Sequence, residues 1–200
     1  MRIAPVIPVL LIDEDSDAVG LAETLVAAGL PVIEVTLRTE GAMAAIRAMA
    51  GVEGAVVGAG TVLNEAMLGD AVDAGAKFIV SPGLTGPLGR AAIASGVPYL
   101  PGVATAGDIM RGLELGFDRF KFFPAEASGG LAALKALAGP FGNVRFCPTG
   151  GISEANARAW LRHPSVLCVG GSWIVKTGET ELAAIGVRAR AAAQYARLAF

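Results

Sequence analysis

The run Val32-Ile33-Glu34-Val35-Thr36-Leu37-Arg38 carries a polar side chain at every second position from Glu34 onward. Because side chains alternate between the two faces of a β-strand, the polar residues of this run share one face and its apolar residues share the other. The apolar face suits packing against helices. We therefore expect one strand of a sheet whose apolar face is covered by helices. Glu34, Thr36 and Arg38 should point to the other face, toward the interior of the fold.

Strand-like segments of this kind recur along the chain. They are short apolar runs, most of them rich in β-branched residues and several with glycine near their end. Ala-rich segments with helical periodicity, such as Gly41–Ala50, separate them. The runs start roughly 20 to 27 residues apart, which suits one strand, one helix and two short loops. The eight expected strands are Pro5–Ile12, Val32–Leu37, Val56–Thr61, Phe78–Gly83, Tyr99–Ala104, Arg119–Ala125, Arg145–Gly151 and Val166–Trp173.

Eight alternating units predict an α/β fold in which a parallel sheet is wrapped by helices. Eight parallel strands also close a (β/α)8 TIM barrel, which typically takes about 250 residues. A single barrel domain over residues 1–200 would therefore be compact, with short loops. The alternative is an open doubly wound sheet. The segment after the first expected strand, Leu11-Ile12-Asp13-Glu14-Asp15, contains no GxGxxG motif, which favours the barrel.

Composition excludes several classes of function. Hydrophobic residues make up 54% of the 200 residues, charged residues make up 17%, and the formal net charge is −2. The chain is too apolar for disorder, and its charge gives no indication of binding to nucleic acid or to an anionic membrane. No apolar stretch approaches transmembrane length, and Pro5 and Pro8 interrupt the place of a signal peptide's apolar region. The high apolar fraction fits a homo-oligomer that buries surface between subunits.

The two cysteines and the single histidine indicate neither a disulfide framework nor a metal site. Cys147 and Cys168 lie in apolar runs without CxxC spacing, so we expect buried thiols in a reducing cytoplasm. His163 precedes Pro164 between two expected elements, and the chain has no second histidine. We therefore expect no metal.

Lys121 lies in an aromatic run, Phe120-Lys121-Phe122-Phe123, inside an expected strand. Alternation places Arg119, Lys121 and Phe123 on one face, which the fold would turn to the same interior as Glu34. Burial favours the neutral amine, and a neutral lysine amine attacks carbonyl carbons and can form a Schiff base. Two structural alternatives are an edge-strand lysine that reaches water and a structural ion pair with Glu34. Convergence at strand ends, where barrel active sites lie, favours catalysis.

Two glycine pairs follow the last two expected strands. Pro148-Thr149-Gly150-Gly151-Ile152-Ser153 comes after the seventh, and Val169-Gly170-Gly171-Ser172-Trp173 comes at the end of the eighth. Glycines let backbone N–H groups approach an anion closely, and barrels often bind phosphate with these two loops. The sequence therefore predicts a phosphorylated small-molecule ligand, with ordinary turn glycines as the alternative.

Seven segments of the chain, in order and with matching spacing, are similar to a known family. The sequence resembles the 2-dehydro-3-deoxy-6-phosphogluconate (KDPG) aldolases, class I aldolases that also act on 4-hydroxy-2-oxoglutarate (KHG). The similarity runs from about Pro5 to Trp173. The matching segments are Glu34–Thr39, Gly58–Asn64, Ser81–Gly83, Pro101–Thr105, Lys121–Glu126, Arg145–Gly151 and Gly170–Trp173.

The resemblance implies roles for individual residues at the reacting centre. Lys121 matches the Schiff-base lysine, and Glu34 matches the glutamate that shuttles protons, by way of a water. Arg38 matches the residue that contacts the substrate carboxylate. Thr61 and Pro82 match residues that line the pyruvate side of the pocket.

The remaining implied residues surround the rest of the substrate. Thr149 matches a polar contact near the reacting centre, and Phe123 matches a residue that packs against it. The residues that match the family's phosphate site are Gly150, Gly151, Gly171 and Ser172.

The resemblance also implies an activity and a setting. The family cleaves KDPG to pyruvate and glyceraldehyde 3-phosphate through a Schiff base, without metal or other cofactor. It forms homotrimers and serves the Entner–Doudoroff pathway in the cytoplasm. Three alternatives stay open: the sister aldolase for the galactonate-derived epimer, a phosphate-binding barrel isomerase with Glu34 as base and no Schiff base, and a non-catalytic sugar-phosphate-binding barrel.

Overall fold

A computed structural model describes residues 3–14 and 16–195, within which strands and helices alternate. The first half contains β1 (Val6–Leu10), α1 (Ala18–Ala27), β2 (Val32–Thr36), α2 (Ala42–Ala50), β3 (Val56–Gly60), α3 (Glu65–Asp73), β4 (Phe78–Val80) and α4 (Gly86–Ser95). The second half contains β5 (Tyr99–Leu100), β6 (Gly102–Val103), α5 (Ala106–Glu114), β7 (Arg119–Phe122), α6 (Gly130–Ala138), β8 (Arg145–Pro148), α7 (Ala157–Leu161), β9 (Val169–Gly171) and α8 (Leu182–Ala193). Each of the eight expected runs therefore contains a strand.

The fifth expected run forms two short strands because Pro101 separates β5 from β6. Proline has no backbone N–H, so it cannot donate a hydrogen bond to a neighbouring strand. Its carbonyl still accepts a hydrogen bond from the Lys121 N–H at 2.9 Å. One residue therefore interrupts a stretch that otherwise continues from β5 into β6.

All the strands pair in parallel, in two sheets. The larger sheet has the order β5-β4-β3-β2-β1-β9, and the smaller has the order β6-β7-β8. Isolated parallel bridges, Phe146 with Val166 and Thr149 with Gly170, connect the β8 and β9 segments. The expected α/β fold with parallel strands is confirmed. Among the residues that the structure describes, a single ladder of eight strands is not found, because β5 and β6 belong to different sheets and only isolated bridges join β8 to β9.

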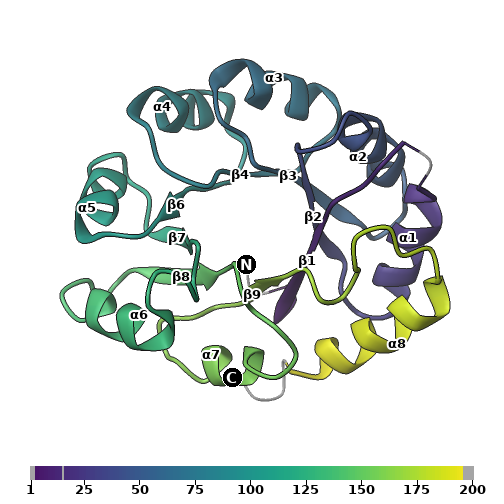
Figure 1. Ribbon diagram of the computed structural model, residues 1–200. Coiled ribbons are helices and arrows are strands. Elements are labelled where there is room, and N and C mark those ends of the chain that lie inside the picture. Colours follow the sequence, from purple (N-terminus) through teal and green to yellow (C-terminus); the bar gives the residue numbers. More distant parts are fainter. Residues whose placement is uncertain (1–2, 15, 196–200) are drawn as a thin grey trace.

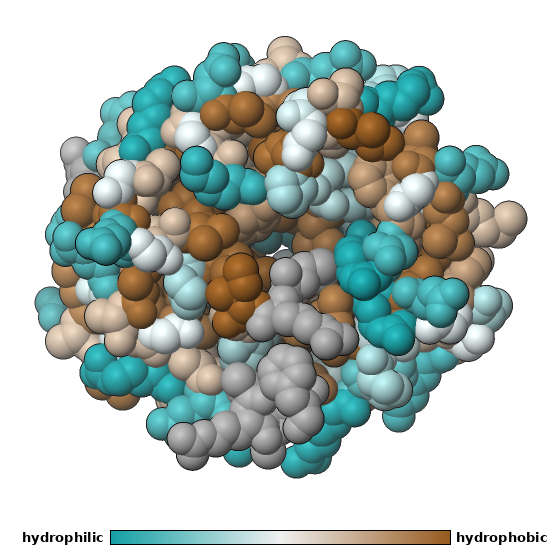
Figure 2. Space-filling model, turned by 180° about the vertical axis from the view of Figure 1, so that it is seen from behind, coloured by the Kyte–Doolittle hydropathy of each residue, from teal (hydrophilic) through white to brown (hydrophobic). Residues whose placement is uncertain are grey.

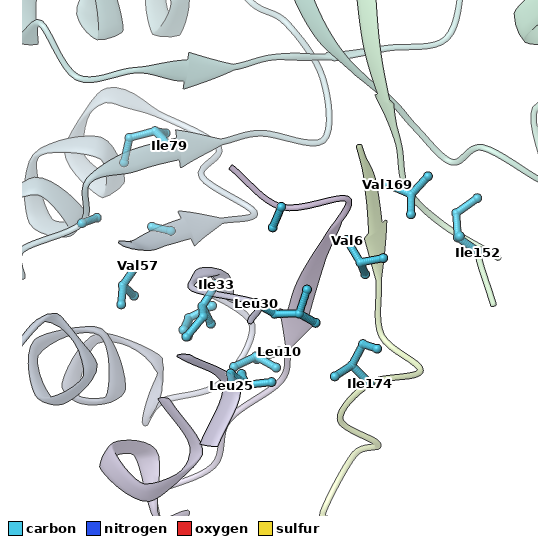
Figure 3. Close-up of a cluster of buried hydrophobic side chains, with 14 of the residues drawn as sticks. Val6, Leu10, Leu25, Leu30, Ile33, Val57, Ile79, Ile152, Val169 and Ile174 are labelled. Carbon is cyan, nitrogen blue, oxygen red and sulfur yellow. The ribbon is translucent and has the colours of Figure 1, made fainter. Parts of the chain in front are cut away.

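The strands curl around a common centre and the helices lie outside them (Figure 1). The described helices all lie on this outer side, whereas the doubly wound alternative would place helices on both faces of a sheet. The main apolar core fills the layer between strands and helices. Figure 3 shows part of it, where Leu10 of β1 and Ile33 of β2 lie with Leu25 of α1. Full burial of such a side chain contributes about 1.5–3 kcal/mol to folding.

A smaller apolar cluster fills the inner side of the strands. It contains Ile7, Val32, Val80, Leu100, Cys147 and Cys168. In β2, Val32 belongs to this cluster, whereas Ile33 and Val35 belong to the outer core. The expected alternation of this strand is therefore confirmed, and it turns the buried Glu34 and Thr36 to the inner side.

The two inner cysteines are free, buried thiols, as the sequence predicts. A hydrogen bond with Cys147, together with burial, raises the pKa of Cys168 well above its ordinary value. Both cysteines pack as small apolar side chains in the inner cluster, where Cys147 on β8 is the register partner of Lys121.

The two ends of the strands differ in character. The first residues of several strands, among them Val32, Val56 and Phe78, line a hollow of about 380 Å³. Figure 2 shows this hollow near the middle of the face that is turned away from the viewer in Figure 1. The glycine-rich loops lie at the opposite, carboxyl ends of the strands. Within residues 3–14 and 16–195, none of the helices has the length and apolar character needed to cross a membrane.

Candidate active site

Lys121 and Glu34 meet in the interior of the fold. Lys121 lies on β7, Glu34 lies on β2, and the distance from Lys121 Nζ to Glu34 Oε1 is 3.0 Å. Their side chains are only 7% and 4% exposed. The edge-strand alternative for Lys121 is wrong, because β7 lies between β6 and β8 and the amine does not reach water. The predicted convergence of this acid and this base is confirmed.

A missing side chain on the neighbouring strand makes room for this pair. A Cβ at Gly60, the last residue of β3, would lie 2.2 Å from Oε1 of Glu34. Any other residue at this position would displace the carboxylate from Lys121. Gly60 is not among the site residues that the sequence predicts, although a glycine inside an expected strand often marks such a close approach.

Phe123 and Thr149 lie on the same inner face as Lys121. Lys121 Nζ lies 5.1 Å from the centre of the Phe123 ring. Thr149 is buried and follows Cys147, the register partner of Lys121, by two residues, so it lies one step closer to the mouth. Its hydroxyl is 3.5 Å from the Cys147 carbonyl, a long hydrogen bond that leaves it able to bond another group. A Cβ at Gly170 would lie 2.3 Å from this hydroxyl, so Gly170 provides the space for it.

Thr61 and Pro82 lie at the carboxyl ends of β3 and β4, and both are half-buried. Thr61 has a φ of 61°, in the left-handed region that is uncommon for a residue other than glycine. Backbone outliers of this kind concentrate at functional sites, where the surrounding structure holds them in place.

Arg38 does not lie in the interior that alternation predicted. β2 ends at Thr36, and the backbone N–H of Arg38 donates to the Thr36 carbonyl in the turn that follows. The alternation rule holds only inside a strand, so it does not extend to Arg38. Arg38 is instead exposed at the mouth, and it forms no ion pair with any residue the structure describes.

The two glycine loops lie side by side at this mouth. The bridge between Thr149 and Gly170 joins them. Gly150 and Gly151 have φ values of 98° and 79°, so both adopt the left-handed backbone that favours glycine. At Gly171, a Cβ would lie 1.7 Å from the ring of Trp173, which again requires glycine.

The loops carry backbone donors without acceptors. The N–H groups of Gly151, Ile152, Ser172 and Trp173 donate no hydrogen bond to another described residue. Consecutive N–H groups in a turn form a concave site for an anion. The side chains of the described residues, in contrast, form no group of three or more His, Cys, Asp or Glu placed to hold a metal ion.

Comparison with known proteins gives one consistent result. The chain matches the family model described as "KDPG and KHG aldolase" over residues 1–187. It is 57% identical over 199 residues to the 2-dehydro-3-deoxy-phosphogluconate aldolase of Zymomonas mobilis, a match that covers 100% of this chain and 96% of that protein.

Two solved structures extend the comparison to the fold. A crystal structure of the Zymomonas mobilis ZM4 2-keto-3-deoxy-6-phosphogluconate aldolase with 3-phosphoglycerate has a TM-score of 0.95 at 57% identity, over 97% of this chain and 93% of that one. The KDPG aldolase of Legionella pneumophila, with pyruvate captured as a covalent carbinolamine intermediate, has a TM-score of 0.92 at 44% identity, over 96% and 95% of the two chains. The chain therefore belongs to the KDPG and KHG aldolase family and is a carbon–carbon lyase.

Proposed function

We propose that the protein is a class I aldolase that cleaves KDPG to pyruvate and glyceraldehyde 3-phosphate. The observation that carries this proposal is the buried contact of 3.0 Å between Lys121 Nζ and Glu34 Oε1. A carboxylate at this distance can take a proton from the ammonium and leave a neutral amine. The amine nitrogen then attacks the ketone carbon of the substrate and gives a carbinolamine, which loses water to form an iminium ion.

Glu34 acts as general base and then as general acid. It takes the proton from the C4 hydroxyl, the C3–C4 bond breaks, and its electron pair moves to the iminium to give an enamine. Glyceraldehyde 3-phosphate leaves. Glu34, by way of a water, returns a proton to C3 of the enamine, and hydrolysis of the new iminium releases pyruvate and restores the Lys121 amine. The reaction needs no metal or other cofactor, because the iminium itself accepts the electrons.

We assign the two ends of the substrate to different groups at the mouth. Arg38 is exposed and free to turn toward a carboxylate, which an arginine holds by charge-assisted hydrogen bonds. Thr61 and Pro82 would line the pyruvate side, and Phe123 and Thr149 the reacting centre. The phosphate would bind the two loops at Gly150, Gly151, Gly171 and Ser172, where the N–H groups of Gly151 and Ser172 have no acceptor among the described residues. Binding at this remote group would orient the reacting bond.

One experiment tests the covalent step. The protein is incubated with pyruvate and borohydride, and the modified peptide is identified by mass spectrometry. We expect a reduced pyruvate adduct on Lys121, no adduct in Lys121→Ala, and full labelling in Lys135→Arg, which changes an exposed lysine of α6. An unlabelled wild type, or a label that persists in Lys121→Ala, would support an isomerase or a binding protein instead.

Substrate choice needs a separate measurement. The gluconate- and galactonate-derived substrates differ at one hydroxyl, and KHG lacks the phosphate. We expect the highest kcat/KM on KDPG, a lower one on the galactonate epimer, and measurable cleavage of KHG to pyruvate and glyoxylate. A higher kcat/KM on the galactonate-derived epimer would identify the protein as the sister aldolase instead.

We further propose that the two sheets are parts of one (β/α)8 barrel in a single domain over residues 1–200. The bridges between the β8 and β9 segments and the hydrogen bond across Pro101 support this closure. By family resemblance we also propose a homotrimer that works in the cytoplasm, in the Entner–Doudoroff pathway. Size exclusion with light scattering tests the oligomer, and a mass other than that of a trimer contradicts it.

A further inference from the structure

Glu126, which follows β7, accepts two hydrogen bonds on one carboxylate oxygen. Asn156 Nδ2 donates to Oε1 at 3.0 Å, and Trp160 Nε1 donates to the same atom at 2.9 Å. Trp160 is only 1% exposed. A buried N–H without an acceptor costs about 1–3 kcal/mol, so Glu126 provides the acceptor that lets this indole lie in the core. The mechanism above uses neither Glu126 nor Asn156.

The same two residues also hold the first glycine loop. Asn156 Nδ2 donates to the Gly151 carbonyl at 3.1 Å, and Asn156 Oδ1 accepts from the Ser153 N–H at 2.8 Å. The backbone N–H of Glu126 donates to the Gly150 carbonyl at 3.0 Å. Two consecutive carbonyls of the loop are therefore anchored to one network.

Anchored carbonyls determine where the loop's donors point. A trans peptide unit is planar, and its C=O and N–H point in opposite directions. The carbonyl of Gly150 shares a peptide unit with the N–H of Gly151, and the carbonyl of Gly151 shares one with the N–H of Ile152. Both carbonyls point into the network, so both N–H groups point away from it, and neither donates to another described residue.

Packing leaves the loop little freedom to turn over. A Cβ at Gly151 would lie 2.6 Å from both Cβ and Cγ of Glu126, so the stem of this side chain lies directly against the glycine. The charge of Glu126 cannot be what attracts an anion, because a carboxylate near an anion repels it. Its contribution to this loop must therefore come from its hydrogen bonds and its packing.

We propose that Glu126 and Asn156 are positioning residues for the substrate phosphate: they hold the Gly150 and Gly151 carbonyls so that the N–H groups of Gly151 and Ile152 face the anion. This inference rests on the proposed function, in which the substrate carries a phosphate at this loop. It concerns binding of one end of the substrate and leaves the Schiff-base chemistry at Lys121 unchanged.

The test compares a phosphorylated substrate with its dephosphorylated form. Steady-state cleavage of KDPG and of 2-dehydro-3-deoxygluconate is measured for the wild type, Asn156→Ala, Glu126→Ala and Glu126→Gln. Asn156→Ala removes the side-chain bond to the Gly151 carbonyl. Glu126→Ala keeps its backbone bond to Gly150 but removes the acceptor of the Asn156 amide and the stem that packs against Gly151. Each change should therefore raise KM for KDPG about tenfold. We expect kcat/KM on the dephosphorylated substrate, and the rate of borohydride trapping of pyruvate, to stay at the wild-type value. Glu126→Gln keeps an acceptor oxygen and removes the charge, so it should restore KM for KDPG.

Controls separate positioning from general damage. Glu154→Gln removes an exposed charge in the same loop, outside the network, and should match the wild type on both substrates. Equal losses on both substrates in Asn156→Ala would overturn the inference and leave the proposed function standing. If the wild type cleaves both substrates with the same kcat/KM, the loops do not bind the phosphate, and the inference fails for that reason. Asn156 is half-buried, so its alanine variant tests the idea even if Glu126→Ala fails to fold.

Discussion

Gly60 lies directly beside the carboxylate of Glu34, where a Cβ would stand 2.2 Å from Oε1. β2 and β3 pair so that Thr36 lies opposite Gly60. Gly60 has no positive φ, so the backbone does not require glycine here. The requirement is for space: only a residue without a side chain lets the carboxylate of Glu34 reach the amine of Lys121.

Gly60→Ala should therefore impair catalysis more than folding. The methyl group would push the carboxylate by about 1 Å, and a displacement of that size can cost about 100-fold in rate. Overpacking should also lower the free energy of unfolding by about 1–3 kcal/mol. Measurement of kcat and of urea-induced unfolding checks both effects.

Gly69 in α3 is the matched control, since a Cβ there would meet nothing within 4 Å. Gly69→Ala should keep the wild-type kcat and gain about 0.5–1 kcal/mol of stability, because alanine favours the helix. A wild-type kcat in Gly60→Ala would show that Glu34 does not need this space.

Glu34→Gln should uncouple proton transfer from binding. Glutamine keeps the hydrogen-bonding shape but cannot exchange protons, and loss of a general acid–base group costs about 10²–10⁴-fold. We expect kcat on KDPG to fall by this factor. Exchange of the pyruvate methyl protons with deuterium, followed by NMR, should fall in parallel because it passes through the enamine. Exchange at the wild-type rate in Glu34→Gln would mean that another group transfers the proton. The control is Glu53→Gln, which changes an exposed residue and should exchange at the wild-type rate.

The Lys121–Glu34 contact should also be visible in stability. Lys121→Met leaves the Glu34 carboxylate buried without its cation, and removal of one partner from a buried pair costs about 3–5 kcal/mol. Adding Glu34→Gln removes the orphaned charge, so the double variant should be more stable than Lys121→Met alone. Urea unfolding of the two single variants and the double variant measures the coupling. Strictly additive effects would mean that the pair does not interact.

Alternation of side chains predicted the core of the site because it is a local property of strands. It placed Glu34 and Lys121 on the inner face, where they meet. The same rule was wrong for Arg38, because β2 ends two residues earlier and the chain turns. It also could not show that Pro101 would divide one expected strand into two. That outcome depends on which backbone N–H groups must donate hydrogen bonds to the neighbouring strands.

Other parts of the site depend on contacts between distant segments. Gly60 is recognised as essential only when Glu34 from the neighbouring strand lies against it. The bond from Asn156 to Glu126 joins residues 30 positions apart. Asn156 lies in a segment with helical periodicity, Ala155–Arg162, but in none of the segments that match the family, so the sequence did not assign it a role. Periodicity predicts which face a residue occupies, but not which residue lies opposite it.

An ion pair between Glu179 and Arg188 ties the segment after β9 to α8 and gives a prediction about pH. Arg188 Nε also donates to the Ile174 carbonyl at 3.0 Å. The hydrogen bond from Arg188 lowers the pKa of Glu179, and burial opposes it more weakly. A carboxyl whose pKa is lower in the folded than in the unfolded chain stabilises the fold fully above the unfolded value, about 4.3. That contribution is lost as the pH falls through the folded value.

Glu179→Gln removes this contribution, so the wild type should exceed the variant in stability at pH 7 and lose its advantage below about pH 4. The pair is partly open to solvent, which limits the expected difference at pH 7 to about 0.5–1 kcal/mol. Urea unfolding of both proteins across this pH range measures it. The control is Glu181→Gln, an exposed neighbour that forms no ion pair with a described residue and should show no such pH-dependent difference. A gap between wild type and Glu179→Gln that stays constant down to pH 3 would mean that packing, and not the charge of Glu179, holds this segment to α8.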